Sequence, residues 1–251
     1  MASSGFLAFM SRLSSNVRRA RPLLGTLVEI RLPREAAGAI EEGFEALERV
    51  HRLMSRQDSE SDVSRINAAS AGSVIAIDPW TMAVLQRAKE IHALTDGLFH
   101  WEQLEIIDSA VHVKQRVRLT LDGIAKGYAV DRAVDALRRA GADCGAVNAG
   151  GDLRVFGKQP EPIHVRHPRS PGKLVHIGQV TEAAVASSGA YFSAAEFFDP
   201  RTGKVVKPGY GITVIALDCT TADALTKPCL LEPSRSSVIA ARFGALAVVM
   251  Q

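Results

Sequence analysis

Cysteine is scarce in this 251-residue chain, and the cysteines it has lack the spacing of a bonded framework. Cys144, Cys219 and Cys229 are an odd number and include no CxxC pair. This pattern argues against a disulfide scaffold and against a cysteine-ligated zinc site, and it predicts buried thiols.

The chain also lacks a large excess of charge of one sign, and it lacks long apolar runs. The net charge is only +3, and the basic residues are scattered apart from Arg18, Arg19 and Arg21, which disfavours nucleic-acid binding. The apolar stretch from Gly5 to Met10 is too short to span a membrane, and no other segment reaches that length. We therefore expect no nucleic-acid partner and no membrane-spanning segment.

The beginning of the chain has little of what an export signal needs. No charged region precedes the apolar stretch, and no cysteine lies near it to carry a lipid anchor. We expect residues 1–20 to be a disordered leader.

The common active-site signatures are absent as well. The chain contains no GxxxxGK[ST], GxSxG or HExxH motif, no Rossmann fingerprint and no EF-hand loop. Any activity must therefore be inferred from less common segments.

What remains is the composition of an ordinary globular protein, with 47% hydrophobic and 23% charged residues. Apolar positions three and four residues apart predict helices over 36–55, 79–95, 125–140, 221–231 and 234–243, the last capped by Ser234. Short apolar or alternating runs predict strands over 27–32, 72–78, 111–121, 144–149, 153–157, 163–167, 175–180, 212–217 and 245–250. Strands outnumber helices without alternating regularly with them, so we predict an α+β fold with mixed or antiparallel sheets and packed helices.

The segment LTLDGIAKGYAVD (119–131) places a lysine where a strand passes into a helix. Helix N-termini favour anions, so a cation there is unusual. Lys126 either faces an anion outside the chain, such as a phosphate, or is a solvated side chain. Further along the helix we expect Ala129, Ala133 and Leu137 to face the core and Asp131 to face solvent.

Two glycine-containing turns have similar alternatives. In NAGGD (148–152), the paired glycines either allow a ligand to approach the backbone closely or form a hairpin turn. In FDPRTG (198–203), turn dipeptides predict a hairpin, in which Arg201 either binds an anion or braces the loop.

The segment TTADALTK (220–227) combines a carboxylate with nearby hydroxyls. Asp223 and Thr226 are three residues apart and share one face of a helix, and their oxygens would suit Mg²⁺. Alternatively, Thr220 or Thr221 caps the helix and Asp223 simply favours its first turn.

Taken in order, seven segments resemble the ApbE family of flavin transferases (FAD:protein FMN transferase). They are RPLLGTLVEI (21–30), RVHRLMSRQDSESDVSRINA (49–68), TDGLF (95–99), GIAKGYAVDRAVDAL (123–137), VNAGGDLRVFG (147–157), ASSGAYF with DPRTG (186–203) and TADALTK (221–227). The resemblance implies one domain of T-fold-related architecture over residues 21–251. It also implies a Mg²⁺-dependent enzyme that cuts FAD at its diphosphate, releases AMP and joins FMN to a threonine hydroxyl of an acceptor protein.

The resemblance also implies roles for individual residues. Lys126 and Asp223 would be catalytic, and the metal ligands would be the Gly123 carbonyl, Asp223 and Thr226. The positions implied to bind the flavin nucleotide are Leu24, Gln57, Leu98, Phe99, His100, Thr120, Lys126, Asp152, Phe198 and Thr226. The attacking threonine would belong to the acceptor, which is consistent with the lack of a nucleophile motif here. Family members are typically exported to the periplasm, whereas the weak export signal leaves the cytoplasm open.

The chain departs from the family pattern at several of these positions. Leu24 replaces a methionine, Gln57 an aromatic residue and His100 the aspartate of a GxFD motif. Thr120 and Asp122 stand in a segment that the family writes Asp-Leu-Gly-Gly-Ile, Glu196 replaces a frequent histidine, and Lys227 stands where a ligand threonine is common. These departures leave two alternatives open: a flavin-binding relative with weak or lost transferase activity, and an FAD diphosphatase that uses water as the nucleophile.

Overall fold

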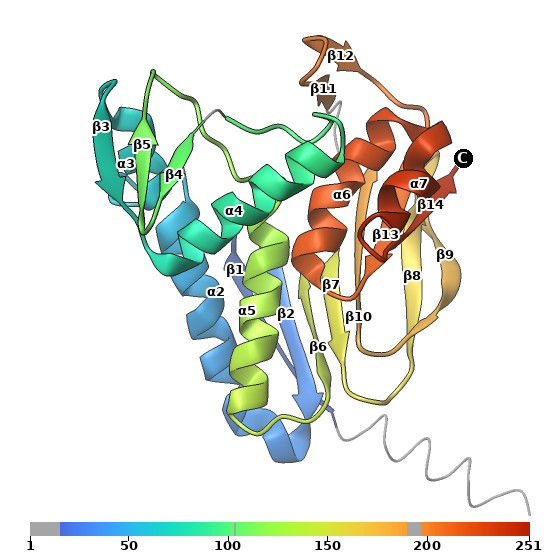
Figure 1. The fold of residues 1–251 in the computed structure, drawn as a ribbon. Coiled ribbons are helices and arrows are strands. Elements are labelled where there is room, and N and C mark those ends of the chain that lie inside the picture. The colour runs from blue at the N-terminus through green and yellow to red at the C-terminus, as the bar shows by residue number, and fades with distance from the viewer. Residues whose placement is uncertain (1–15, 103, 190–196) are drawn as a thin grey trace, which may run out of the picture.

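The structure is a computed structural model that describes residues 16–102, 104–189 and 197–251. Its largest sheet has seven strands, and every neighbouring pair in it is antiparallel (Figure 1). In spatial order these strands are β1 (Asn16–Leu23), β2 (Thr26–Pro33), β6 (Gly145–Ala149), β7 (Asp152–Phe156), β10 (Ala183–Gly189), β13 (Gly211–Ala216) and β14 (Leu246–Met250).

The remaining strands form three small antiparallel sheets. Their members are β3 (Ser73–Ala76), β5 (Ala110–Val113) and β4 (Glu105–Ile107) in one sheet, β8 (Glu161–His167) and β9 (Ser170–Val180) in another, and β11 (Phe197–Asp199) with β12 (Lys204–Val206) in the third.

Six α-helices accompany these sheets in the described chain. They are α2 (Ile40–Met54), α3 (Asp62–Ala68), α4 (Pro79–Leu94), α5 (Ala125–Arg139), α6 (Cys219–Leu231) and α7 (Ser236–Ala241), with 3-10 turns η1 (Arg34–Ala39) and η3 (Pro233–Arg235). Helices and antiparallel sheets together confirm the predicted α+β fold. Within the described ranges, no helix is both long and apolar enough to cross a bilayer.

The core lies between the large sheet and the helices α2, α5 and α6, which stand side by side in front of it in Figure 1. Strand β10 shows how the sheet divides its two faces. Ala184 and Ala186 are buried in the main core, whereas Val185 between them packs with Ile163 of β8 in a second cluster. Because successive strand residues point to opposite faces, the β8–β9 hairpin covers the face that the helices leave.

One predicted strand is mostly wrong. Of the span 111–121, only residues up to Val113 belong to a strand, and residues 114–121 form no regular element although the structure describes them all. The side chain of Asn67 donates to the Leu119 carbonyl at 2.9 Å and accepts from the Leu119 N–H at 2.6 Å. A side-chain amide thus satisfies this backbone as a neighbouring strand would, which alternation alone cannot reveal.

Element boundaries also differ from the predictions at three places. Residues 16–20 of the expected leader form the start of β1, while residues 1–15 and Glu196 lie outside the described residues. Helix α6 is capped by Asp218, which accepts from the Thr221 N–H at 2.7 Å, so neither candidate threonine is the cap. Ser234 lies in η3 and caps no helix, because α7 begins only at Ser236.

Helices α5 and α6 cross so closely that one residue at the contact has no room for a side chain. A Cβ built on Gly127 would lie 2.2 Å from the Cys219 carbonyl oxygen, a backbone atom that cannot turn away. The backbones of the two helices therefore touch at their N-terminal ends.

We predict that Gly127→Ala lowers the free energy of unfolding by about 1–3 kcal/mol, because overpacking forces the helices apart. Urea denaturation followed by circular dichroism measures this change. Gly38→Ala is the matched control, since a Cβ there meets nothing within 4 Å. Alanine is the better helix former at both positions, so a Gly127→Ala protein as stable as the wild type would contradict the close crossing.

Candidate active site

Lys126, the lysine where a strand was expected to pass into a helix, lies beside the NAGGD turn (148–152). Residue Lys126 is in the first turn of α5, and its ammonium forms an ion pair with Asp152, the first residue of β7. The NAGGD turn holds Asp152 in place with Gly150 and Gly151 at φ of 63° and 108°, which favour glycine. A Cβ on Gly150 would also collide with Thr26 Oγ1 at 2.4 Å. The glycines thus serve a tight turn that presents a carboxylate.

Residue Asp223 joins this pair from α6. Its Oδ2 accepts a hydrogen bond from the Gly127 N–H at 3.1 Å, and only 6% of the residue is exposed. Gly127 N–H belongs to the first turn of α5, where backbone donors have no partner inside the helix. Ile124 stands at the N-cap of α5 and has no polar side chain, so Asp223 provides the cap from the neighbouring helix.

The same relation runs in the opposite direction through Asp131. Its carboxylate accepts from the backbone N–H groups of Cys219 and Thr220 at 2.9 and 2.8 Å and forms an ion pair with Arg154 of β7. The expectation that Asp131 faces solvent is therefore wrong, since the residue is only 5% exposed. Periodicity distinguishes apolar from charged faces, but it does not separate a solvent-facing carboxylate from one that meets another helix N-terminus.

We call Lys126, Asp152 and Asp223 the charged cluster. Burial is the main cause that raises the pKa of Asp152 to about 7, and the negative charge of Asp223 adds to it, against the opposing effect of Lys126. Burial would lower the pKa of Lys126, but the charges of Asp223 and Asp152 outweigh it and hold that pKa above its ordinary value. The lysine is therefore charged at all physiological pH values.

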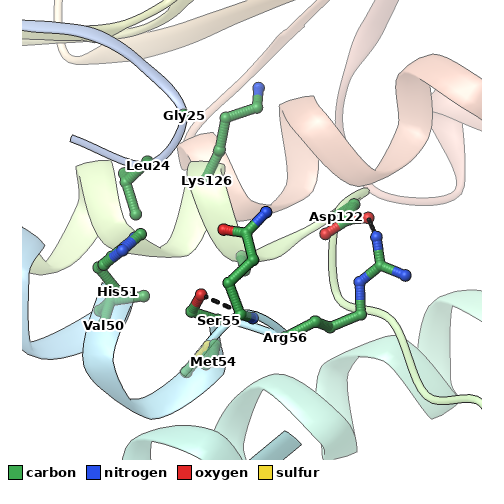
Figure 2. Close-up of a pocket in the computed structure, with 11 residues that line it drawn as sticks. Leu24, Gly25, Val50, His51, Met54, Ser55, Arg56, Asp122 and Lys126 are labelled. Carbon is green, nitrogen blue, oxygen red and sulfur yellow. Dashed lines mark hydrogen bonds and ion pairs between the residues drawn. The ribbon is translucent and has the colours of Figure 1, made fainter. Parts of the chain in front are cut away.

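A small hollow of about 170 Å³ lies on one side of the turn that precedes α5. Among the predicted nucleotide contacts, Leu24, Gln57 and Lys126 line it. Figure 2 shows Leu24 across the hollow from Asp122, which is joined to Arg56 by an ion pair of 3.0 Å.

A larger cavity of about 530 Å³ is lined by the next residue of the same turn, Gly123. It brings together most of the other predicted contacts, namely Leu98, Phe99, His100, Thr120 and Phe198, together with Gly123. Its walls also include Lys227, a residue to which the sequence assigned no contact with the nucleotide. Within the turn, Asp122 lines the small hollow and Gly123 lines the large cavity, and of the charged cluster Lys126 lines the small hollow.

Two predicted residues have other contacts. The Thr226 hydroxyl donates to the Asp223 carbonyl at 2.8 Å and accepts from Ser188 Oγ at 3.0 Å, and the side chain lines neither hollow. Arg201 donates to Asp199 from Nε at 3.2 Å and from a terminal nitrogen at 3.0 Å, and it reaches Glu232 at 2.8 Å. Arg201 therefore braces the β11–β12 hairpin. Its hydrogen bonds to Asp199 lower the pKa of that carboxyl.

Comparison with known proteins places the chain in a family. The model of the ApbE family matches residues 24–108 and 99–250, which is nearly the whole described chain. The chain belongs to the ApbE family. It is 23% identical to the FAD:protein FMN transferase of Vibrio cholerae in an alignment that spans 308 positions, gaps included. The alignment covers all of this chain and 91% of that protein. A second FAD:protein FMN transferase, from Treponema pallidum, is 23% identical over 85% of this chain and 78% of its own length.

Solved structures of ApbE proteins share the fold. The flavin transferase ApbE from Vibrio cholerae superposes with a TM-score of 0.81 at 22% identity, covering 93% of both chains. The apo flavinyl transferase ApbE from Pseudomonas stutzeri gives a TM-score of 0.78 at 21% identity, covering 92% of this chain and 90% of that one. The expected ApbE-like architecture is thereby confirmed.

Mg²⁺ is the ion that the family resemblance implies. Among the described residues, no three histidine, cysteine, aspartate or glutamate side chains gather as a metal centre. The carboxylates of Asp152 and Asp223 nevertheless lie close enough that the charge of Asp223 raises the pKa of Asp152. Carboxylate oxygens are the ligands that Mg²⁺ prefers, and a divalent cation would relieve this repulsion, so these two side chains fit the ion.

We predict that the Asp152 carboxyl titrates near pH 7 in metal-free protein and that Asp223→Asn lowers this pKa, because it removes a neighbouring negative charge. Carboxyl ¹³C NMR measures both values, and the signal that disappears in Asp152→Asn identifies the residue. An unchanged pKa in Asp223→Asn would contradict the proximity of the two carboxylates.

The same shift fixes the sign of a stability effect. The folded-state pKa of Asp152 lies above its ordinary value of 3.8, so its contribution to stability is present below about pH 4 and lost as pH rises through about 7. Between these values, the unfolding free energy of the wild type should fall relative to that of Asp152→Asn. Urea unfolding of both proteins across this range compares the slopes.

Proposed function

We propose that this ApbE family chain transfers FMN from FAD to a threonine hydroxyl of an acceptor protein and releases AMP, with Mg²⁺ as cofactor. The observation that carries the proposal is the charged cluster beside a turn whose Asp122 lines the small hollow and whose Gly123 lines the large cavity. FAD consists of two ring systems joined by a diphosphate. A turn whose neighbouring residues line two hollows, with a half-buried ammonium beside it, suits such a ligand.

In the proposed reaction the acceptor threonine oxygen attacks the phosphorus of the FMN half. A new P–O bond forms to the threonine, the P–O bond to AMP breaks, and the hydroxyl proton is lost to a base. Bound Mg²⁺ would neutralise the diphosphate and the charge that develops on the leaving phosphate. The chain itself would supply the Lys126 ammonium as a fixed second cation.

The carboxylates of the cluster have two parts in this proposal. Asp223 would hold Mg²⁺ with Asp152, while its Oδ2 fixes the start of α5 through Gly127. Asp152 orients the Lys126 ammonium by its ion pair. The Gly123 carbonyl and the Thr226 hydroxyl stay proposed ligands; Gly123 lines the large cavity, which supports its part.

We predict that the purified chain, incubated with FAD, Mg²⁺ and an acceptor protein of the Vibrio cholerae relative, adds one FMN to that acceptor. Mass spectrometry of the acceptor measures the adduct, and the acceptor with its target threonine changed to alanine is the negative control. Asp223→Asn should lower turnover by at least about 100-fold. The change weakens Mg²⁺ binding and also loosens the first turn of α5, which positions Lys126. Asp135→Asn is the matched control, because its carboxylate lies on the outer face of α5 in an ion pair with Arg132.

Other outcomes would replace this proposal. Tight FAD binding without an adduct would favour a flavin-binding relative that has lost transferase activity. Release of AMP and FMN without an acceptor would favour an FAD diphosphatase.

A further inference from the structure

Lysine 227 lies one helical turn after Asp223 on α6, so both side chains emerge on the same side of the helix. Its side chain runs directly over Gly123. A Cβ built on Gly123 would lie 2.9 Å from Lys227 Nζ and 3.4 Å from its Cε. The absence of a side chain at Gly123 is therefore what lets the lysine reach the turn that precedes α5.

The ammonium of Lys227 differs from that of Lys126 in having no bound counter-charge. Lys126 is neutralised by its ion pair with Asp152. Across the described residues, Lys227 forms no ion pair and no hydrogen bond, although its charge acts on Asp152 and lowers the pKa of that carboxyl. It lines the large cavity among Leu98, Phe99 and Phe198, which offer no anion.

An exposed ammonium at an apolar cavity is a ready contact for an anionic group on an aromatic ligand. Lys227 and the charged cluster together hold two ammonium groups and two carboxylates, so their formal charges cancel. A diphosphate bound at this turn would add negative charge. Lys126 neutralises this charge only in part, because it is already paired with Asp152. Lys227 is the neighbouring cation whose donors are all available.

We propose that Lys227 binds a phosphate oxygen of the dinucleotide diphosphate, on the side of the large cavity, and supports diphosphate binding in the absence of a divalent cation. The inference rests on the proposed function, because it takes the diphosphate of FAD as the ligand. Lys227 is thereby a binding residue of this chain beyond those that the family pattern marks.

The test measures FAD affinity in EDTA by quenching of flavin fluorescence, for the wild type, Lys227→Met and Lys227→Gln. Methionine keeps an unbranched stem over Gly123, one atom shorter, and removes the ammonium with its charge and its donors. Both variants should bind FAD about tenfold more weakly or worse, as expected for the loss of one charge-assisted hydrogen bond. Their affinity should also depend less on NaCl concentration, since one ionic contact is gone. Lys158→Gln is the matched control, because Lys158 is exposed and lies beyond the end of β7 opposite Asp152.

Each outcome bears on one proposal. Wild-type affinity in Lys227→Met, or weaker binding with an unchanged salt dependence, would overturn the role of Lys227 and leave the proposed function standing. Wild-type protein that binds FAD only with Mg²⁺ would also overturn it. A wild type that binds no FAD with or without Mg²⁺ would refute the proposed function itself. Urea unfolding of the variants verifies that they fold.

Discussion

The reciprocal capping of α5 and α6 is the interaction on which the rest of the site depends. Asp223 of α6 accepts from the first turn of α5, and Asp131 of α5 accepts from the first turn of α6. Each helix thus satisfies backbone donors that the other cannot satisfy by itself, and each carboxylate lies at the positive end of a helix dipole. Gly127 makes this exchange feasible, because only a residue without a side chain lets the backbones approach so closely.

Strand β7 connects this helix pair to the sheet. Asp152 and Arg154 are two residues apart on the strand, and they pair with Lys126 and Asp131 on α5. Buried ion pairs of this kind contribute little net stability, since the charges lose hydration that their attraction only partly replaces. They do fix geometry, because removing any one partner leaves an unpaired buried charge. Burial and the nearby charge of Asp223 raise the pKa of Asp152, and such perturbed groups are typical of functional sites.

Among the described residues, those that depart from the family pattern line the two hollows. Leu24 and Gln57 line the small hollow, whereas His100, Thr120 and Lys227 line the large cavity. The charged cluster, whose Lys126 lines the small hollow, keeps the lysine and both carboxylates. The substitutions thus change the walls that would contact a nucleotide, while the charges at the turn remain.

The sequence by itself determined the α+β class and most helices. Periodicity and turn residues are local, and they located α5, β7 and α6. The motifs pointed to Lys126 and Asp223, and the family resemblance added Asp152. Only the tertiary structure decided which of these residues meet. Asp223 reaches Gly127 across 96 positions of the chain, a relation that local patterns do not contain. In the tertiary structure Asp131 is buried, and the Thr226 hydroxyl accepts a hydrogen bond from Ser188. The side chain of Lys227 lies over Gly123. In each case the deciding factor was a neighbouring element that is distant in sequence, because a polar side chain takes the partner that packing brings to it.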